Sequence, residues 1–230
     1  MRRSSAQEQR GNAPRELWDL KWVREPQQDR SAQTRGKLMD AAESLLAEEG
    51  MSAVTIARVT RRAQSSNGSF YHYFQDKKAL LYAVVERRAI EVADTVARGL
   101  EPAQWESVPV IDILEGYVRF SLKSGKRNIG VLEAQRVLAM EDAHIAARWA
   151  RTNQETRASL MRILRPKFAE IGHREPRVAV ELLLESLRAM INMRLRGYLP
   201  GAKSGLPRMS EEAFVKELRL MASRYLSISE

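Results

Sequence analysis

Residues 55–74 read TIARVTRRAQSSNGSFYHYF, and this stretch decides the fold. Thr55 can cap a short helix over 56–63, and Ser66 can cap a second one over 67–74, because a hydroxyl oxygen accepts hydrogen bonds from the free N–H groups of a first helical turn. Gln64 and Ser65, between the first helix and the cap of the second, include neither Gly nor Pro, yet they interrupt the helical pattern. Two short helices joined by a tight turn are typical of a helix-turn-helix unit.

The charge of this stretch favours a nucleic-acid partner. Three basic residues and no acidic one lie between Gly50 and Gln75, namely Arg58, Arg61 and Arg62. Phe70 and Phe74 are four residues apart, so we expect both to face the core. The polar side chains between and beside them then face outward, and these are Ser69, Tyr71, His72 and Tyr73.

The start of the second helix is rich in small and polar residues. They are Ser65, Ser66, Asn67, Gly68 and Ser69. Small residues let a helix approach a phosphate closely, and an Asn side chain can bind the edge of an adenine. We therefore expect this helix to lie in the major groove of DNA. A helical hairpin with a Tyr-rich solvent face and no nucleic-acid role is the alternative.

Helical periodicity continues on both sides of the unit. Upstream we expect a helix over 32–49 that ends before Gly50, because apolar residues recur on one face: Leu38, Ala41, Ala42, Leu45 and Leu46. Downstream, Asp76 can cap a helix whose apolar residues extend to Val92. The first residues are charged and rich in Gln and Pro, and we expect a flexible arm over 1–30.

Beyond residue 100 the pattern stays helical. Further helices are expected over 110–124, 128–139, 143–170, 175–199 and 211–227. Pro166 should kink or split the third of these, and Pro200 to Pro207 should form a loop. No stretch alternates apolar and polar residues with β-branched enrichment, so we predict no strands. The chain is thus predicted to be all-α with about nine helices, in three parts: a flexible arm (1–30), a helix-turn-helix domain (31–78) and a C-terminal domain (79–230).

Composition limits the function further. The 230 residues include 38 Lys plus Arg against 29 Asp plus Glu, for a net charge of +9, and no Cys. A basic balance fits a polyanionic partner, and the missing Cys excludes disulfides, thiolate metal sites and a cysteine nucleophile. We find no membrane span and no secretory signal, and therefore expect a cytoplasmic protein.

Enzyme chemistry finds little support in the motifs. The three His residues form neither Glu-x-x-His nor His-x-x-x-His. No Gly-rich phosphate loop and no Gly-x-Ser-x-Gly elbow occur, and the acidic residues before His144 are better explained as the first turn of a helix. We therefore expect no catalysis, no metal and no cofactor. A helical module that binds another protein, without specific DNA binding, is the remaining alternative.

Several of these residues resemble the DNA-binding region of the TetR family of bacterial transcriptional regulators. The resemblance covers about residues 32–85. It is carried by TRGKLMDAA (34–42), by GSFYHYF (68–74), and by single positions, which are Gly50, Thr55, Val59, Ala63, Lys77, Leu80 and Leu81.

The resemblance implies an all-α homodimer whose N-terminal three-helix domain binds double-stranded operator DNA and whose C-terminal domain binds a small molecule. Most members are repressors that their ligand releases from DNA. By position, Thr55, Ser66 and Lys77 would lie against phosphates, while Asn67, Ser69 and His72 would face the major groove. The full set of DNA-binding candidates is Arg35, Thr55, Ser65, Ser66, Asn67, Gly68, Ser69, Tyr71, His72, Tyr73 and Lys77.

Two features depart from the usual pattern of that family. The turn is commonly Gly followed by an apolar residue, and here it is Gln64 followed by Ser65. If the backbone of Gln64 takes a positive φ, the turn costs about 1 kcal/mol. Thr60 also stands where a small Ala is usual. These departures bear on the exact pose of the following helix more than on the fold.

The C-terminal part has two helices with broad apolar stripes. On them lie Leu183, Leu184, Leu187 and Ile191, and then Phe214, Leu218, Met221 and Tyr225. An antiparallel pair of such helices has more apolar surface than it can bury alone, which predicts packing against a second copy as a four-helix bundle. The alternative is that both helices belong to the core of a monomer.

A ligand pocket is expected among the helices between residues 85 and 195. Candidate lining residues are Trp105, Tyr117, Phe120, Trp149, Asn153, Met190, Asn192 and Met193. Their aromatic and Met content favours a largely apolar small-molecule effector, although each of them can also be an ordinary core or surface residue. The sequence therefore predicts a homodimeric regulator that binds a palindromic operator and is released by such an effector.

Overall fold

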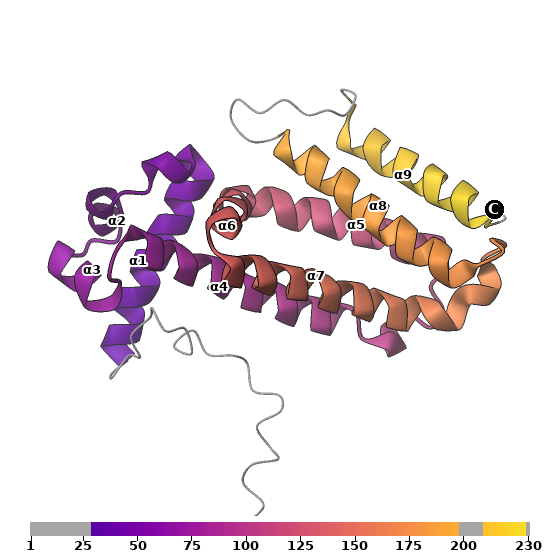
Figure 1. Cartoon of the computed structure of the whole chain (residues 1–230), viewed down its shortest axis with the longest axis horizontal. Helices are drawn as coiled ribbons and strands as arrows, with labels where there is room; N and C mark the ends of the chain where they lie inside the picture. Colours follow the sequence, from indigo (N-terminus) through magenta and orange to yellow (C-terminus); the bar gives the residue numbers. More distant parts are fainter. Residues whose placement is uncertain (1–28, 198–208, 229–230) are drawn as a thin grey trace, which may run out of the picture. The chain divides into compact units, whose positions relative to one another are not determined.

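The computed structural model describes residues 29–197 and 209–228. Within them every regular element is a helix (Figure 1), as predicted. The elements are α1 (Asp29–Glu49), η3 (Met51–Ala53), α2 (Ile56–Arg62), α3 (Asn67–Tyr73), α4 (Lys77–Gly99), η4 (Pro102–Gln104), α5 (Val110–Arg127), α6 (Ile129–Glu141), α7 (Ala143–Leu164), η5 (Arg165–Glu170), α8 (Pro176–Arg196) and α9 (Glu211–Leu226). The fold is therefore all-α, and none of these helices is both long enough and apolar enough to cross a bilayer.

Residue contacts divide the chain into two compact units between Val92 and Ala93, inside α4. The sequence pattern had placed the boundary earlier, after residue 78. The first half of α4 belongs with the helix-turn-helix because Arg87 forms ion pairs with Asp40 at 2.8 Å and Glu43 at 2.9 Å on α1. The flexible arm expected over 1–30 lies outside the described residues, apart from the first two residues of α1.

The core of the first unit follows the predicted helix faces. Leu38 and Leu45 of α1 are buried, as is Val59 of α2. Phe70 and Phe74 are also fully buried, with ring centroids 5.7 Å apart. The prediction that these two rings face inward is confirmed. The opposite side of α3 is therefore the side that a partner can contact.

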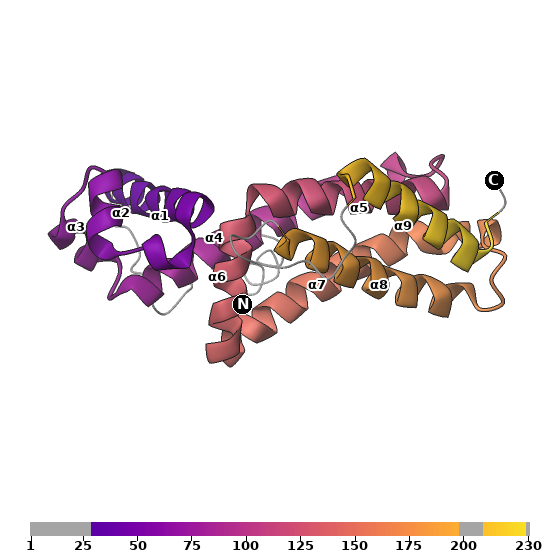
Figure 2. The same cartoon turned by 90° about the horizontal axis from the view of Figure 1, so that it is seen from above.

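The second unit is built on three mutually packed helices, α5, α8 and α9. Helices α8 and α9 lie side by side and antiparallel (Figures 1 and 2). α5 packs against both of them, and its backbone approaches α8 so closely that a Cβ built at Gly125 would lie 2.3 Å from Leu195 Cδ1. α7 ends at Leu164, and Pro166 lies in the 3-10 turn that follows, so the predicted split of the 143–170 segment is confirmed.

The predicted dimer residues need correction. Six of them are core residues of this chain, buried to within 4% of complete: Leu183, Leu184, Leu187, Ile191, Phe214 and Leu218. Met221 and Tyr225 are half-buried against the same core. The prediction was wrong because it considered α8 and α9 as an isolated pair, whereas α5 covers the stripe that the pair cannot bury alone.

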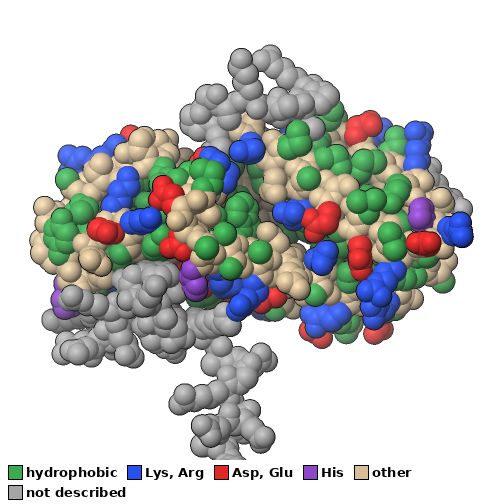
Figure 3. All heavy atoms as spheres, viewed as in Figure 1, with side chains coloured by type: hydrophobic (Ala, Val, Ile, Leu, Met, Phe, Trp, Pro, Cys, Tyr) green, Lys and Arg blue, Asp and Glu red, His purple; other side chains and the backbone are tan. Residues whose placement is uncertain are grey.

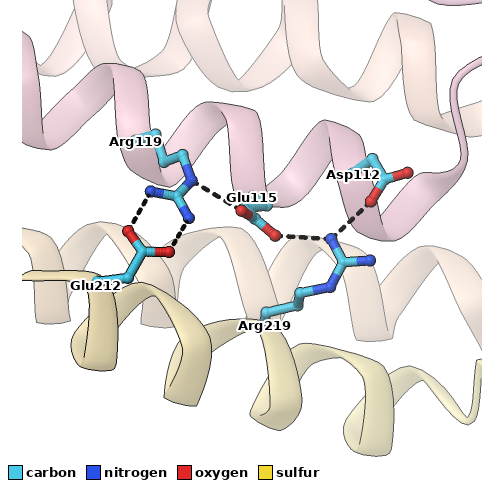
Figure 4. Close-up of polar contacts among 5 residues, drawn as sticks. All are labelled: Asp112, Glu115, Arg119, Glu212 and Arg219. Atoms are coloured by element: carbon cyan, nitrogen blue, oxygen red, sulfur yellow. Dashed lines mark hydrogen bonds and ion pairs between the residues drawn. The ribbon is translucent and has the colours of Figure 1, made fainter.

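A network of charges ties α9 to α5 (Figure 4). Arg119 donates from Nη1 and Nη2 to both carboxylate oxygens of Glu212, at 2.8 and 2.6 Å, and from Nε to Glu115 at 2.7 Å. Arg219 donates to Asp112 at 2.6 Å and to the other Glu115 oxygen at 2.7 Å. Glu115 therefore lies between two guanidinium groups, which hold its pKa below the ordinary value of 4.5.

Candidate nucleic-acid interface

Both short helices of the helix-turn-helix are capped as predicted. The side chain of Thr55 accepts a hydrogen bond from Arg58 N at 3.3 Å at the start of α2. The side chain of Ser66 accepts one from Ser69 N at 3.0 Å at the start of α3. These local bonds fix where each helix begins, and hence which residues form the first turn of α3.

The turn between the helices is a left-handed helix end without glycine. Gln64 has φ 50°, its N–H donates to Arg61 O at 3.2 Å, and the N–H of Ser65 donates to Thr60 O at 2.9 Å. These two bonds make a Schellman motif with Gln64 at the left-handed position. A non-glycine residue there costs about 1 kcal/mol, so the expected strain of this turn is present.

The outward side of α3 carries most of the DNA-binding candidates. Asn67, Gly68, Tyr71 and His72 are exposed, and the Tyr71 side chain is 54% accessible. Thr55 and Ser66 are exposed at the two helix starts, while Ser65 and Ser69 are half-buried. The structure thus places seven of the candidates on α3 or directly before it, over buried phenylalanines, and Thr55 at the start of α2.

Two candidates are buried instead. Tyr73 is 8% exposed, because it follows Phe70 by three residues and so shares its inward face. Its ring packs edge-on against the ring of His72, with centroids 4.7 Å apart. Arg35 is 5% exposed, and burial lowers the pKa of its guanidinium. The expectation that the side chain of Tyr73 faces outward was wrong, and Arg35 is likewise not a surface residue.

Lys77 has a structural partner that the sequence did not reveal. Its ammonium group donates to the backbone carbonyl of Met51 at 3.2 Å and so ties the start of α4 to η3. The neighbouring Asp76 caps α4 as predicted, since its Oδ1 accepts a hydrogen bond from Ala79 N at 2.7 Å. A lysine ammonium has two further N–H groups, so the phosphate contact expected of the half-buried Lys77 stays a prediction.

The basic charge of the unit is partly neutralised from α1. Arg62 pairs with Glu48 at 2.7 Å, and Arg58 pairs with Glu49. Hydrogen bonds from these arginines lower the pKa of both carboxyl groups. The count of charges between residues 50 and 75 missed this, because the two glutamates precede that window. Across the described residues no carboxylate pairs with Arg61.

The ligand-pocket candidates do not come together at one enclosed site. Phe120 and Met193 are 43% and 42% exposed, and Asn192 is exposed, so these three are surface residues. Tyr117 and Met190 are half-buried against the core, and burial raises the pKa of the Tyr117 hydroxyl.

The remaining three candidates for the ligand pocket are Trp105, Trp149 and Asn153. Trp105 packs against the same core and donates from its indole N–H to Gly99 O at 2.8 Å. Trp149 and Asn153 lie four residues apart on α7 and are half-buried. Among the residues that the structure describes, no three His or acidic side chains gather as a metal-ligand set.

Charged side chains are mixed rather than segregated on the face shown in Figure 3, where Lys and Arg lie among Asp and Glu over both units. The excess of positive charge in the sequence therefore does not form one large basic patch on this face of the molecule.

Comparisons with known proteins agree with this geometry. Residues 38–84 match the family model described as bacterial regulatory proteins, tetR family. The HTH-type transcriptional regulator BetI of Cronobacter sakazakii is 37% identical over 84 residues, which are 36% of this chain and 42% of that protein. The transposon Tn10 TetC protein of Escherichia coli is 26% identical over 117 residues, 50% of this chain and 58% of that protein.

Solved structures extend the likeness over both units. A TetR-family regulator from Mesorhizobium loti superposes with a TM-score of 0.66 at 16% identity, covering 87% of this chain and 98% of that one. Salmonella enterica GusR gives a TM-score of 0.57 at 22% identity, covering 84% and 95%. The chain spans 42% and 58% of the two sequence relatives, whereas it shares its fold with these structures over nearly their whole length. Residues 38–84 thus match the DNA-binding region of the tetR family of bacterial regulatory proteins, and the chain shares its all-helical fold with solved structures of that kind.

Proposed function

We propose that this protein is a sequence-specific DNA-binding transcriptional regulator, and a repressor rather than an enzyme. The observation that carries the proposal is the exposed side of α3, where Asn67, Gly68, Tyr71 and His72 lie together above buried phenylalanines. A short rigid helix with an amide, a small residue and hydroxyl groups outward has the side chains that a major-groove helix needs. The name of one sequence relative, the HTH-type transcriptional regulator BetI, supports it.

Gly68 adds an independent argument. A Cβ built at this position meets only Ser66 Oγ, at 3.7 Å, so the fold itself has room for alanine. Glycine inside a helix costs about 0.5–1 kcal/mol relative to alanine. A residue that the protein's own packing does not require is explained if the backbone of α3 must approach a partner closely.

The proposed mechanism needs a second copy and an effector. Two copies related by a two-fold axis would present two α3 helices to a palindromic operator, about one turn of DNA apart. A small, largely apolar molecule that binds better to a dimer with wrongly spaced helices would lower operator affinity by its differential affinity for the two states. The half-buried aromatic and Met residues of the second unit, Trp105, Tyr117 and Met190, support an apolar effector.

The test is selection of bound duplexes from a randomised pool at about 150 mM salt, an ionic strength at which nonspecific phosphate binding is weak. We expect an enriched inverted repeat. Asn67→Ala should change the preferred bases, whereas Tyr71→Phe should weaken the selected site and random DNA alike. Salt-sensitive binding without any enriched sequence would contradict the proposal and favour a helical protein-interaction module.

A further inference from the structure

One hydrogen bond joins α2 to the outward face of α3. The hydroxyl of Thr60 donates to Oδ1 of Asn67 at 3.1 Å, across the turn. Thr60 is 4% exposed, whereas Asn67 is exposed as the first residue of α3. A buried side chain therefore holds one end of an amide whose other end faces away from the protein.

The hydroxyl of the buried Thr60 also lies close to the backbone of its own helix. Its Oγ1 lies 3.0 Å from Ile56 O and 3.3 Å from Ala57 O, in the first turn of α2. A threonine hydroxyl has one proton and all three neighbours are acceptor oxygens, so Asn67 Oδ1 shares this proton with the backbone carbonyls of α2. Its position is fixed by the packing of α2, and the position of the Asn67 amide follows from it.

We infer that Thr60 is a positioning residue that fixes the rotation of the Asn67 carboxamide and so sets which base edge this side chain binds, an inference that rests on the proposed function. With Oδ1 bonded to Thr60, Nδ2 is the end of this exposed amide that is left to donate to a partner. Donors directed into the major groove select acceptors, which are purine N7, guanine O6 and thymine O4. A freely rotating Asn also presents its oxygen and can then bind adenine through both groups. Specificity at this base pair therefore depends on a residue that itself is too buried to touch DNA.

The strain of the turn at Gln64 increases the structural importance of the hydrogen bond between Thr60 and Asn67. An apolar contact between the residues that flank a left-handed helix end often anchors such a turn. Here the flanking residues are Thr60 and Ser65, both polar, and among the described residues the Thr60 side chain reaches beyond α2 through its hydrogen bond to Asn67. The bond thus links the pose of α3 to the same side chain that orients its first residue.

A matched pair of variants separates the hydroxyl from the shape. Thr60→Val keeps the branched shape and removes the hydroxyl, whereas Thr60→Ser keeps the hydroxyl and removes the methyl group. Both should fold, because the Asn67 oxygen that valine leaves without a donor is at the surface and can bind water. Thermal midpoints check this, and a purely structural role of Thr60 would affect folding and overall affinity without changing base preference.

The experiment is duplex selection with the wild type, Asn67→Ala, Thr60→Val and Thr60→Ser. We expect one base pair in each half-site whose preference Asn67→Ala abolishes. Thr60→Val should lower discrimination at that same pair by about fivefold, the effect of one hydrogen bond, and Thr60→Ser should keep it. Unchanged preference in Thr60→Val, or no base pair that depends on Asn67, overturns the inference and leaves the proposed function standing. If the wild type selects no sequence, both fail.

A second measurement does not depend on DNA. The side-chain amide of Asn67 should have a rigid nuclear magnetic resonance order parameter in the wild type and in Thr60→Ser, and a flexible one, below about 0.6, in Thr60→Val. Equal order parameters in all three proteins would overturn the inference whatever the DNA experiments give.

Discussion

At the scale of single residues, two positions of the helix-turn-helix hold a residue that makes the fold less stable than another residue would. Gln64 has a positive φ that glycine would adopt without strain. Gly68 lies in a helix where alanine would fit. At each position, one substitution therefore allows the effect on stability to be measured separately from the effect on DNA binding.

Gln64→Gly should stabilise the protein by about 1 kcal/mol, because it removes the strain of a left-handed side chain. Urea unfolding followed by circular dichroism measures this. Gln64→Ala is the control, since alanine has the same Cβ and should give no gain. If the alanine variant gains as much stability as the glycine variant, backbone strain at Gln64 is not the cause of the gain.

Gly68→Ala should raise the free energy of unfolding by about 0.5–1 kcal/mol and lower the affinity for the selected operator. Gly36→Ala in α1 is the matched control, because no atom lies within 4 Å of a Cβ built there and it lies outside α3. It should gain stability with operator affinity unchanged. Equal operator affinity in the two variants would argue against close approach at Gly68.

At the scale of elements, local signals in the sequence predicted the helices and their caps well. Thr55, Ser66 and Asp76 cap the helices that their positions indicated, since a cap depends on neighbours three residues away. The burial of Arg35 was missed, because it depends on which helices pack together, whereas that of Tyr73 could have been predicted from its spacing of three residues from Phe70.

The same limit explains the error over α8 and α9. A stripe of leucines shows that a helix face is buried, but not what buries it, and here the partner is α5 within the same chain. The ion pairs of Arg58 and Arg62 were missed for a related reason, because their partners lie on another helix. The residues between 50 and 75 show their own charges but not the carboxylates of another helix that pair with them.

The network between α5 and α9 should make stability depend on acid pH. Arg119 lowers the pKa of Glu115 and Glu212 from 4.5, and these carboxylates raise the pKa of Arg119. A carboxyl group with a lowered folded pKa stabilises the protein above its unfolded pKa, and this contribution is lost as the pH falls through the lowered value. Arg119→Met should therefore be less stable than the wild type at pH 7, with a difference that shrinks below pH 4.5.

Unfolding curves at several pH values test this. Arg151→Met is the control, because Arg151 is an exposed arginine of α7 outside the network. A difference between Arg119→Met and the wild type that stays constant down to pH 2 would mean that the carboxylates do not contribute through this network. High salt should reduce the effect, since the groups are largely exposed.

At the scale of the whole molecule, the corrected burial moves the expected dimer contact to the outer side of α8. Val178, Leu182 and Met193 are 55%, 56% and 42% exposed, and their spacing of four and eleven residues puts them on one face. Exposed apolar stripes of this kind mark interaction surfaces. Leu182→Glu should therefore shift the protein from dimer to monomer in sedimentation velocity at micromolar concentration.

Met140→Glu provides the matched control, since Met140 is an exposed apolar residue of α6 at 71%. It should sediment as the wild type does. A monomeric wild type would contradict the proposed homodimer, and dissociation of Met140→Glu alone would place the contact on α6 instead.

The ion pairs from α1 bear on how DNA binding responds to added salt. A duplex releases about 0.9 of a condensed counterion for each phosphate that a protein cation neutralises. Glu49 and Glu48 already neutralise Arg58 and Arg62, so at a DNA surface these arginines would displace no counterions as intact pairs. Each pair should make the logarithmic salt slope shallower by about 0.9 than the arginine count implies. A regulator built this way would give up some nonspecific attachment to bulk DNA, and would depend correspondingly more on the bases beneath α3.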